Sequence, residues 1–329
     1  MPRNIALVGC GAIAHQFHLT ALATRRHDFD KVWVVDPSDR ARQIACSIVA
    51  AEQCAALSDI ADDLQFVIVA SPNANHFAAS QEALSRDAHV LIEKPFVIWP
   101  DEGRELINLA AERHRIIAIN QTRRFFPRTQ ELRRRISSGE FGALSRIVHN
   151  EGEKLNWSFS SGAAFAKGSQ RTGVIMDMGV HVLDLYQYLL APAWVFRSTI
   201  HDGFKGPEGL AELRLEANGA PVSIRLSRYQ AQENIAHLDF EHALVQIDIY
   251  KQNAYSITTK SRGGNRQFVV QPPVVDVAFL SDRILTNFVA ATVGQEEAVC
   301  EAMSSLPVIN ILDEIYRCAN HYPDTPGKV

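Results

Sequence analysis

Short hydrophobic runs alternate with segments of helical spacing over the first part of the chain. The apolar runs are four or five residues long and lie at 4–8, 32–35, 66–70, 89–92 and 116–119. The segments between them have helical spacing and lie at 12–25, 39–50, 75–86 and 101–114. Continuous runs of this kind are typical of strands buried on both faces, as in a parallel sheet with helical crossovers. The pattern predicts an α/β domain with a doubly wound parallel sheet, the Rossmann fold, in residues 1–121.

The pattern changes after Asn120. An alternating strand at 144–153 lies between predicted helices at 127–138 and 174–190, and two more helices are predicted at 277–293 and 306–319. The remaining strand-like stretches lie at 195–201, 210–217, 222–229, 235–240, 244–250 and 255–259. Strands that follow one another without helices between them indicate an antiparallel sheet. We therefore expect an α+β domain with an open, mostly antiparallel sheet in residues 122–329.

Composition and charge exclude several classes of protein. The chain has 329 residues, of which 47% are hydrophobic and 21% charged, and its net charge is −4. These values are those of a globular protein rather than a disordered one. The longest basic run is Arg133–Arg135, so there is no basic stripe for nucleic acid or an anionic membrane. No apolar run approaches the roughly 18 residues that a membrane span needs.

The cysteines and the N-terminus indicate a compartment. Five cysteines are scattered along the chain without a C-x-x-C pair, so neither a disulfide framework nor a zinc site is predicted. The first eleven residues run directly into a strand pattern and do not have the architecture of a signal peptide. We expect a soluble, cytoplasmic protein with reduced thiols and no metal.

A glycine-rich motif follows the first predicted strand and opens a helix. The segment Gly9–Ala14 has the form G-x-G-x-x-A. Gly9 would allow a tight turn, and Gly11 would let the backbone approach a pyrophosphate at the helix N-terminus. The cofactor-binding residues predicted here are Gly9, Gly11, Ala12 and Ile13. The alternative is an ordinary strand–helix turn that is rich in small residues.

An acidic residue strengthens the dinucleotide hypothesis. Asp36 ends the second predicted strand, 22 residues beyond the end of the glycine motif. An acid at this place hydrogen-bonds the ribose 2′-hydroxyl of NAD and repels the 2′-phosphate of NADP. Pro37 and Ser38 follow it rather than an arginine, which favours NAD. The alternative is that Asp36 caps the helix that begins near Asp39.

Two further motifs follow parallel strands. Ser71–His76 comes after the strand at 66–70, and Glu93–Pro95 comes after the strand at 89–92. Ligands bind at the carboxyl ends of strands in open α/β sheets, so Lys94 would lie beside a cofactor. The alternative is a loop lysine paired with Glu93. The cofactor-binding residues predicted at these strand ends are Ser71, Pro72, Asn73, His76, Glu93, Lys94 and Asn120.

The helix at 174–190 carries polar residues along one side. Asp177, His181, Asp184 and Tyr188 follow at spacings of four, three and four, which places them in one stripe at about 100° per residue. The rest of the helix is mostly apolar, so it is expected to be buried, and buried polar groups need partners. A core histidine held by one of the two acids is the alternative. The pattern lacks the second histidine of zinc-binding helices, so no metal is expected.

Together these motifs resemble the Gfo/Idh/MocA family, named after glucose–fructose oxidoreductase and inositol dehydrogenase. The five motifs of the family match, in order, Gly9–Ala14, Ser71–His76, Glu93–Pro95, Arg124–Pro127 and Asp177–Asp184. The resemblance extends from residue 5 to about 320. The family's glycine-rich lead-in to the last motif is reduced here to Arg171-Thr172-Gly173.

The resemblance implies both an architecture and a catalytic set. It implies an N-terminal dinucleotide-binding domain and a C-terminal α+β domain whose open sheet face forms the subunit interface. A homodimer or homotetramer is expected, because an uncovered sheet face would expose apolar surface. The catalytic lysine of the family falls on Lys94, and its acid–histidine pair falls on Asp177 and His181.

The residue types suit the oxidation of an alcohol. His181 is the best candidate base, since its unperturbed pKa is near neutrality. Asp177 would orient it or hold a substrate hydroxyl, and Lys94 would stabilise a developing alkoxide or share the role of base. Arg123 and Arg124 could bind a carboxylate or diphosphate or make salt bridges instead. The sequence does not decide between these roles.

On this basis we expect the function of an NAD-dependent oxidoreductase. The hydride would pass between the nicotinamide and a ring hydroxyl or ketone of a sugar, polyol or nucleotide sugar. The substrate-binding residues predicted for it are Lys94, Arg123, Arg124, Trp157, Asp177 and His181; Trp157 suits a sugar ring and could equally be a packing residue. Two alternatives are an NAD-dependent glycosidase with a closed redox cycle and a protein that senses the dinucleotide without turnover.

Overall fold

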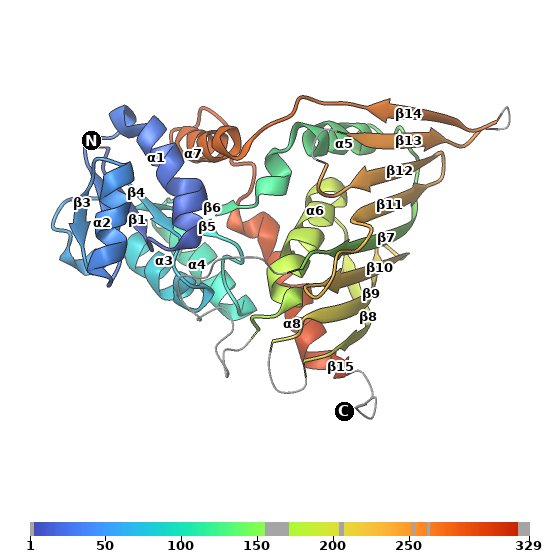
Figure 1. The fold of residues 1–329 in the computed structure, drawn as a ribbon, viewed down its shortest axis with the longest axis horizontal. Helices are drawn as coiled ribbons and strands as arrows, with labels where there is room; N and C mark the ends of the chain where they lie inside the picture. The colour runs from blue at the N-terminus through green and yellow to red at the C-terminus, as the bar shows by residue number, and fades with distance from the viewer. Residues whose placement is uncertain (1–2, 155–170, 204–206, 252–253, 262–263, 322–329) are drawn as a thin grey trace. The chain divides into compact units, whose positions relative to one another are not determined.

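The computed structural model contains two sheets, each in its own unit of the chain (Figure 1). The structure describes residues 3–154, 171–203, 207–251, 254–261 and 264–321. The first unit comprises residues up to 125 together with 275–309, and the second unit comprises the other described residues.

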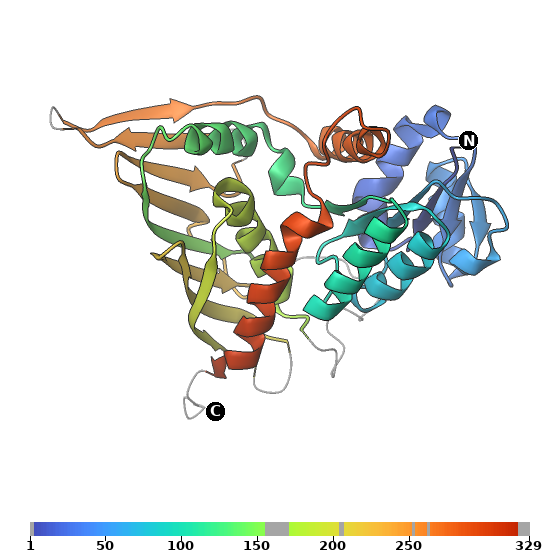
Figure 2. The same cartoon turned by 180° about the vertical axis from the view of Figure 1, so that it is seen from behind.

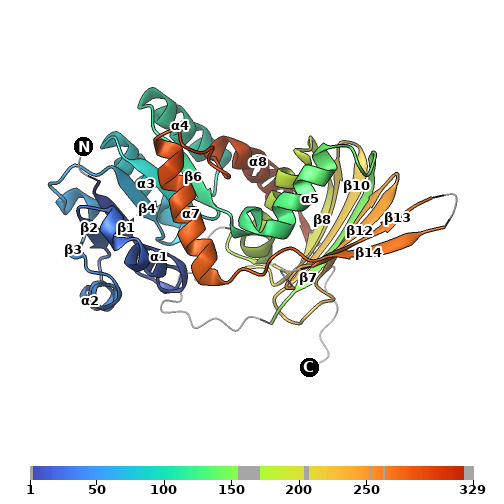
Figure 3. The same ribbon diagram turned by 90° about the horizontal axis from the view of Figure 1, so that it is seen from above.

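The first unit is built on a six-stranded parallel sheet in the order β3-β2-β1-β4-β5-β6. The strands are β1 (Ile5–Val8), β2 (Val32–Val35), β3 (Glu52–Cys54), β4 (Phe66–Val69), β5 (His89–Glu93) and β6 (Ile117–Asn120). The crossover helices are α1 (Leu19–Thr24), α2 (Asp39–Ile48), α3 (His76–Ser85) and α4 (Pro100–Glu112). Helix α1 packs against α2, and α3 packs against α4 on the other face of the sheet (Figure 3). The strand order reverses at β1 and β4, so the prediction of a doubly wound α/β fold is confirmed.

The apolar runs form the centre of this sheet. Every residue of β4 and β5 is buried, as expected for strands covered on both faces. Strand β3 was not predicted. Its sequence, Glu52-Gln53-Cys54, is polar and largely exposed at the edge of the sheet, so it has no apolar pattern that would mark it.

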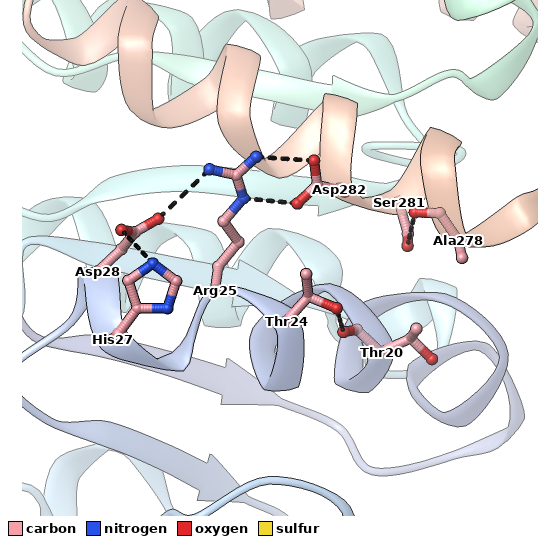
Figure 4. A network of polar contacts seen from close by, with 8 residues as sticks. All are labelled: Thr20, Thr24, Arg25, His27, Asp28, Ala278, Ser281 and Asp282. Atoms are coloured by element: carbon pink, nitrogen blue, oxygen red, sulfur yellow. Dashed lines mark hydrogen bonds and ion pairs between the residues drawn. The ribbon is translucent and has the colours of Figure 1, made fainter.

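A segment near the C-terminus completes the first unit. Helix α7 (Val277–Thr292) packs on α1, where Arg25 binds Asp282 through two hydrogen bonds of 2.5 and 2.8 Å (Figure 4). Further on, the backbone N–H of Ile119 in β6 donates to the carbonyl of Cys300 at 2.8 Å. The sequence analysis placed residues 275–309 in the C-terminal domain. These contacts with α1 and β6 explain why the segment belongs to the first unit.

The second unit is built on a nine-stranded sheet in the order β14-β13-β12-β11-β7-β10-β9-β8-β15 (Figure 2). Its strands are β7 (Leu144–Gly152), β8 (Trp194–His201), β9 (Leu210–Ala217), β10 (Ala220–Ser227), β11 (Ile235–Phe240), β12 (Ala243–Asp248), β13 (Tyr255–Thr259), β14 (Arg266–Val270) and β15 (Asn320–His321). Helices α5 (Pro127–Ser137) and α6 (Val180–Leu190) and the end of α8 (Ala302–Cys318) lie on one face. Within the described residues, no helix is both long and apolar enough to span a membrane.

The strands of this sheet alternate between buried and more exposed positions, and the prediction of a mostly antiparallel sheet is confirmed. Two pairs are parallel, β7 with β10 and β15 with β8. Strand β14 was not predicted, because four of its five residues are exposed at the sheet edge. Helix α8 begins one turn before the predicted start at 306. A helix that began at 306 would have Pro307 in its first turn, where a proline is tolerated. In the structure Pro307 lies inside α8.

Charged side chains lie on the face of the sheet away from the helices. Ion pairs link neighbouring strands across it: Arg197 lies 2.6 Å from Glu216, and Arg225 lies 3.8 Å from Glu212. The sequence analysis based its expectation of an oligomer partly on apolar surface at this face. Four strand residues of this sheet are exposed apolar side chains, Val195 and Ile200 on β8 and Phe268 and Val269 on β14. A homodimer or homotetramer stays a prediction.

The pairing of Arg25 with Asp282 makes the attachment of α7 testable. Asp282→Asn is expected to lower the free energy of unfolding by about 1 kcal/mol, because a two-point pair between partly exposed groups contributes on that order. The control is Asp101→Asn, since the pair of Asp101 with Arg104 lies within α4 and is more exposed. Urea denaturation of both variants measures the difference. Equal stability of the two variants would contradict the role given to this pair.

Candidate active site

The first glycine of the motif is required by the fold itself. Gly9 follows β1 with a φ of +95°, in the region that L side chains rarely adopt. A Cβ on Gly9 would lie 2.6 Å from the carbonyl oxygen of Ala70 and 2.6 Å from the backbone nitrogen of Ser71. The turn after β1 therefore lies directly against the turn after β4.

The second glycine is not required by packing. Apart from Gly11 itself, its chain neighbours and the backbone of its own helix, no heavy atom of the described residues lies within 4 Å of the Cβ that Gly11 would carry. Ala12 and Ile13 beside it are half-buried, and the next residue, Ala14, is fully buried and begins a π-helical turn, Ala14–His18. The open space beside Gly11 is what a pyrophosphate approaching the backbone needs. The turn therefore fits a dinucleotide.

Asp36 joins the end of β2 to this turn. Its Oδ2 accepts the backbone N–H of Cys10 at 2.9 Å, and its Oδ1 accepts that of Ser38 at 2.9 Å. The N-cap of α2 is Ser38, whose Oγ accepts the backbone N–H of Ala41. Asp36 is therefore not the cap of α2, and its carboxylate is held beside the glycine motif. Burial raises the pKa of the Cys10 thiol to about 12, so this thiol is not a nucleophile.

His76 ties together the loops after β4 and β5. Its Nδ1 lies 2.8 Å from the carbonyl oxygen of Pro95 and its Nε2 lies 2.8 Å from that of Ser71. Burial lowers its pKa and favours the neutral ring, which donates a hydrogen bond to one of these carbonyls and lies in contact with the other. The buried Oγ of Ser71 has no hydrogen-bond partner among the described residues. The loop that the sequence assigned to the cofactor thus presents an unused polar atom, while Pro72 is exposed and Asn73 half-buried.

Glu93 is buried at the strand end that precedes Lys94. Its Oε1 lies 2.7 Å from Nε2 of His18 and accepts a 2.5 Å hydrogen bond from Nδ2 of Asn120. Burial by itself raises the pKa of Glu93, but His18, Asn120 and the charge of Lys94 outweigh it and lower the pKa below its ordinary value. Glu93 is therefore ionised, and the half-buried Lys94 follows it with its backbone N–H on Oε2.

In the second unit, a π-helical turn, Ile175–Gly179, carries Asp177 and leads into α6. Asp177 and His181 are half-buried, and Asp184 is fully buried. The guanidinium of Arg228, just after β10, binds Oδ2 of Asp177 through Nε at 3.1 Å and through a second, closer nitrogen. The helix is thus buried nearly all round, as expected, and its acid has a partner that was not predicted.

The two candidate arginines differ. Arg124 is buried, and its guanidinium donates to Oγ of Ser304 at 2.8 Å and to the carbonyl of Val299 at 3.3 Å. It holds the returning chain of the first unit. Arg123 is half-buried. Trp157 lies outside the described residues.

Sequence reasoning missed His18 and Arg228. His18 meets Glu93 from 75 residues away, and Arg228 meets Asp177 from 51 residues away. Neither residue belongs to a motif of the sequence. Only the position of His18 in the first helix gave a weak signal of a functional role: its spacing places a polar side chain on the side of the helix that faces the sheet.

The contrast between the two glycines can be tested directly. Gly9→Ala is expected to lose at least about 2 kcal/mol of stability, because it adds a side chain at positive φ against Ala70. Gly11→Ala is expected to keep the parent stability within about 0.5 kcal/mol and to weaken NADH binding at least ~10-fold. Thermal unfolding and NADH fluorescence titration measure these effects. Tight NADH binding by Gly11→Ala would contradict the assignment of the site.

Known proteins similar to this chain are dehydrogenases. The chain is 29% identical over 198 residues to D-glucoside 3-dehydrogenase of Escherichia coli. This match covers 57% of this chain and 54% of the relative. The chain is 33% identical over 151 residues to UDP-N-acetylglucosamine 3-dehydrogenase of Acidithiobacillus ferrooxidans, a match that covers 45% and 42%. The matches thus span about half the length of these relatives.

A solved structure shares the fold over nearly the whole chain. It is the WlbA dehydrogenase of Bordetella pertussis in complex with NADH and UDP-GlcNAcA, with a TM-score of 0.81 at 19% identity over 97% of this chain and 95% of that one. Two family descriptions match the sequence itself. Residues 3–121 match the NAD-binding Rossmann fold of the oxidoreductase family, and residues 129–250 match the GFO/IDH/MocA C-terminal domain. The chain therefore belongs to the Gfo/Idh/MocA family of oxidoreductases.

Proposed function

We propose that this protein is an NAD-dependent oxidoreductase that transfers hydride between the nicotinamide and a ring hydroxyl or ketone of a sugar, polyol or nucleotide sugar. The observation that carries the proposal is the open space beside Gly11 next to the held carboxylate of Asp36. Membership of the family and the sugar substrates named for its relatives support it. The glycosidase and the dinucleotide sensor find no support among these relatives.

The first unit holds the cofactor in this proposal. Gly9, Gly11, Ala12 and Ile13 would line the pyrophosphate, and Asp36 would accept from the ribose hydroxyls. Ser71, Pro72, Asn73, His76, Glu93, Lys94 and Asn120 would form the rest of the binding surface, with His76 and Glu93 positioning their loops. When bound, NAD supplies the carbon that accepts or returns the hydride. Similar structures hold NAD in one case and NADP in another, and Asp36 favours NAD here.

Three residues act on the substrate in this proposal. His181 takes the hydroxyl proton, because a neutral imidazole is the best base near neutral pH. Lys94 stabilises the negative charge that develops on the substrate oxygen. Asp177 accepts a hydrogen bond from a hydroxyl group of the substrate. Arg123, which is half-buried, and Arg124, which is buried, are both proposed to contact a substrate anion.

The assembly and the compartment remain predictions. A homodimer or homotetramer rests on the family resemblance, and a cytoplasmic location rests on the sequence. All five cysteines of the chain are free thiols in the structure, which is compatible with a reducing compartment.

The activity can be tested with a substrate panel. NADH formation is followed on mixing the protein and NAD with polyols, free sugars and uridine-diphosphate sugars. Lys94→Ala is expected to lower kcat at least ~100-fold, because one charge-stabilising group in an active site contributes on that order. NADH binding is expected to weaken far less than kcat falls, because Lys94 is one of many residues on the proposed cofactor surface. The control is Lys251→Ala, an exposed lysine that pairs with Asp248. A parent protein that binds NADH but turns over no member of the panel would overturn the proposal.

The preference for NAD can be tested without a substrate. Asp36→Asn is expected to lower the ratio of NADPH to NADH dissociation constants at least ~10-fold, because it removes the charge that repels the 2′-phosphate. Asp39→Asn is the matched control, since Asp39 is an exposed aspartate three residues later that pairs with Arg42. Fluorescence titrations with both cofactors measure the ratio. An unchanged ratio in Asp36→Asn would count against NAD specificity through this residue.

A further inference from the structure

The helix that carries Asp177 begins with backbone N–H groups that need acceptors from elsewhere. The N–H of Val174 donates to the carbonyl of Glu208 at 2.7 Å, and that of Ile175 donates to Oε1 of Glu208 at 3.0 Å. The N–H of Met176 donates to the hydroxyl oxygen of Tyr316 at 3.1 Å. The acceptors thus come from the loop before β9 and from α8, both distant in sequence. The start of this helix is held by tertiary contacts.

Glu208 and Tyr316 also bind one another. The hydroxyl of Tyr316 donates to Oε1 of Glu208 at 2.7 Å. Burial raises the pKa of both groups, that of Tyr316 well above its ordinary value, so the hydroxyl keeps its proton and remains a donor. A Cβ on Gly173 would clash with the carboxyl group of Glu208, so the chain before the helix passes directly over this carboxyl group. The side chains of Glu208 and Tyr316 are thus bonded to one another while they accept the N–H groups of Ile175 and Met176.

Arg228 is attached to the same loop. Its backbone N–H donates to the carbonyl of Gly209 at 2.7 Å, one residue after Glu208. Its guanidinium binds a single oxygen of Asp177, Oδ2, through two nitrogens. The side chain of Arg228 is 19% exposed and that of Asp177 is 40% exposed, so the contact is partly shielded from water. The loop that contains Glu208 and Gly209 therefore supplies acceptors to the start of the helix and also holds Arg228, which binds Asp177.

We propose that Glu208, Tyr316 and Arg228 are positioning residues for the reaction. Glu208 and Tyr316 fix the turn that carries Asp177, and Arg228 fixes the orientation of its carboxylate. Asp177 is then a fixed hydrogen-bond acceptor for the substrate, and His181 remains the proposed base. This inference rests on the proposed function, in which Asp177 contacts the substrate.

The first test separates positioning from binding. Arg228→Gln is expected to lower kcat ~10- to 100-fold with KM within ~3-fold of the parent, because misplacing a group by about 1 Å costs up to ~100-fold. Arg228→Lys is expected to recover most of this loss, since a lysine can supply a point charge to one oxygen. Arg225→Gln is the matched control on β10, an exposed arginine near Glu212. An unchanged kcat in Arg228→Gln, or a loss shared by NADH binding and thermal stability, would overturn the role of Arg228.

The second test needs no turnover. Tyr316→Phe removes the acceptor for the N–H of Met176, and amide hydrogen exchange in a peptide covering 173–180 is expected to become at least ~10-fold faster. Tyr188→Phe, on the same helix and with its ring beneath Arg133, is the control and should leave that peptide unchanged. Unchanged exchange in Tyr316→Phe would overturn the role of Tyr316. Faster exchange in a protein without activity would support the helix anchoring and refute the proposed function instead.

Discussion

The parallel register of the first sheet is the constraint on which the cofactor site depends. Val8 pairs with Val35 and with Val69, and Glu93 pairs with Asn120, so the carboxyl ends of the strands are level. In an antiparallel sheet, neighbouring strands would end at opposite edges. Here the segments that follow β1, β2, β4, β5 and β6 begin at the same edge of the sheet, although they are far apart in sequence. The glycine turn and Asp36, which follows β2, meet at this edge, where the backbone N–H of Cys10 donates to Asp36.

Buried polar groups then link these loops through hydrogen bonds. Transferring an ionised carboxylate from water to the interior costs several kcal/mol unless hydrogen bonds replace the lost solvent. Glu93 meets this condition through His18 and Asn120, and the backbone N–H of Lys94 adds a third donor. His76 places the carbonyls of two loops around one ring. Because Glu93 is held by these hydrogen bonds, the backbone position of Lys94 directly after it is defined. A lysine in a solvated loop would not be held in this way.

The sequence was most informative where local pattern and chemistry coincide. Apolar runs marked the buried strands, and each family motif follows a strand or opens a helix, as Gly9 and Asp177 do. It was uninformative where a residue acts through a distant partner. Arg228 lies at the end of an ordinary strand pattern, and Glu208 lies in a loop; each acquires its meaning only when β9 and β10 bring it to the helix start. Short edge strands such as β3 and β14 were missed because exposed positions carry no periodic signal.

The two π-helical turns show why helical spacing alone does not place the candidate groups. One ends at His18, which is buried against Glu93, and the other contains Asp177, which is bound by Arg228. A π turn closes its hydrogen bonds over five residues and persists where surrounding contacts support it. Positions before and after it therefore do not keep the 100° step of an α-helix. The stripe drawn from that step holds only within α6, from His181 onward. The direction of Asp177 depends instead on contacts from outside the helix, so a residue near such a turn is placed by its partners rather than by its spacing.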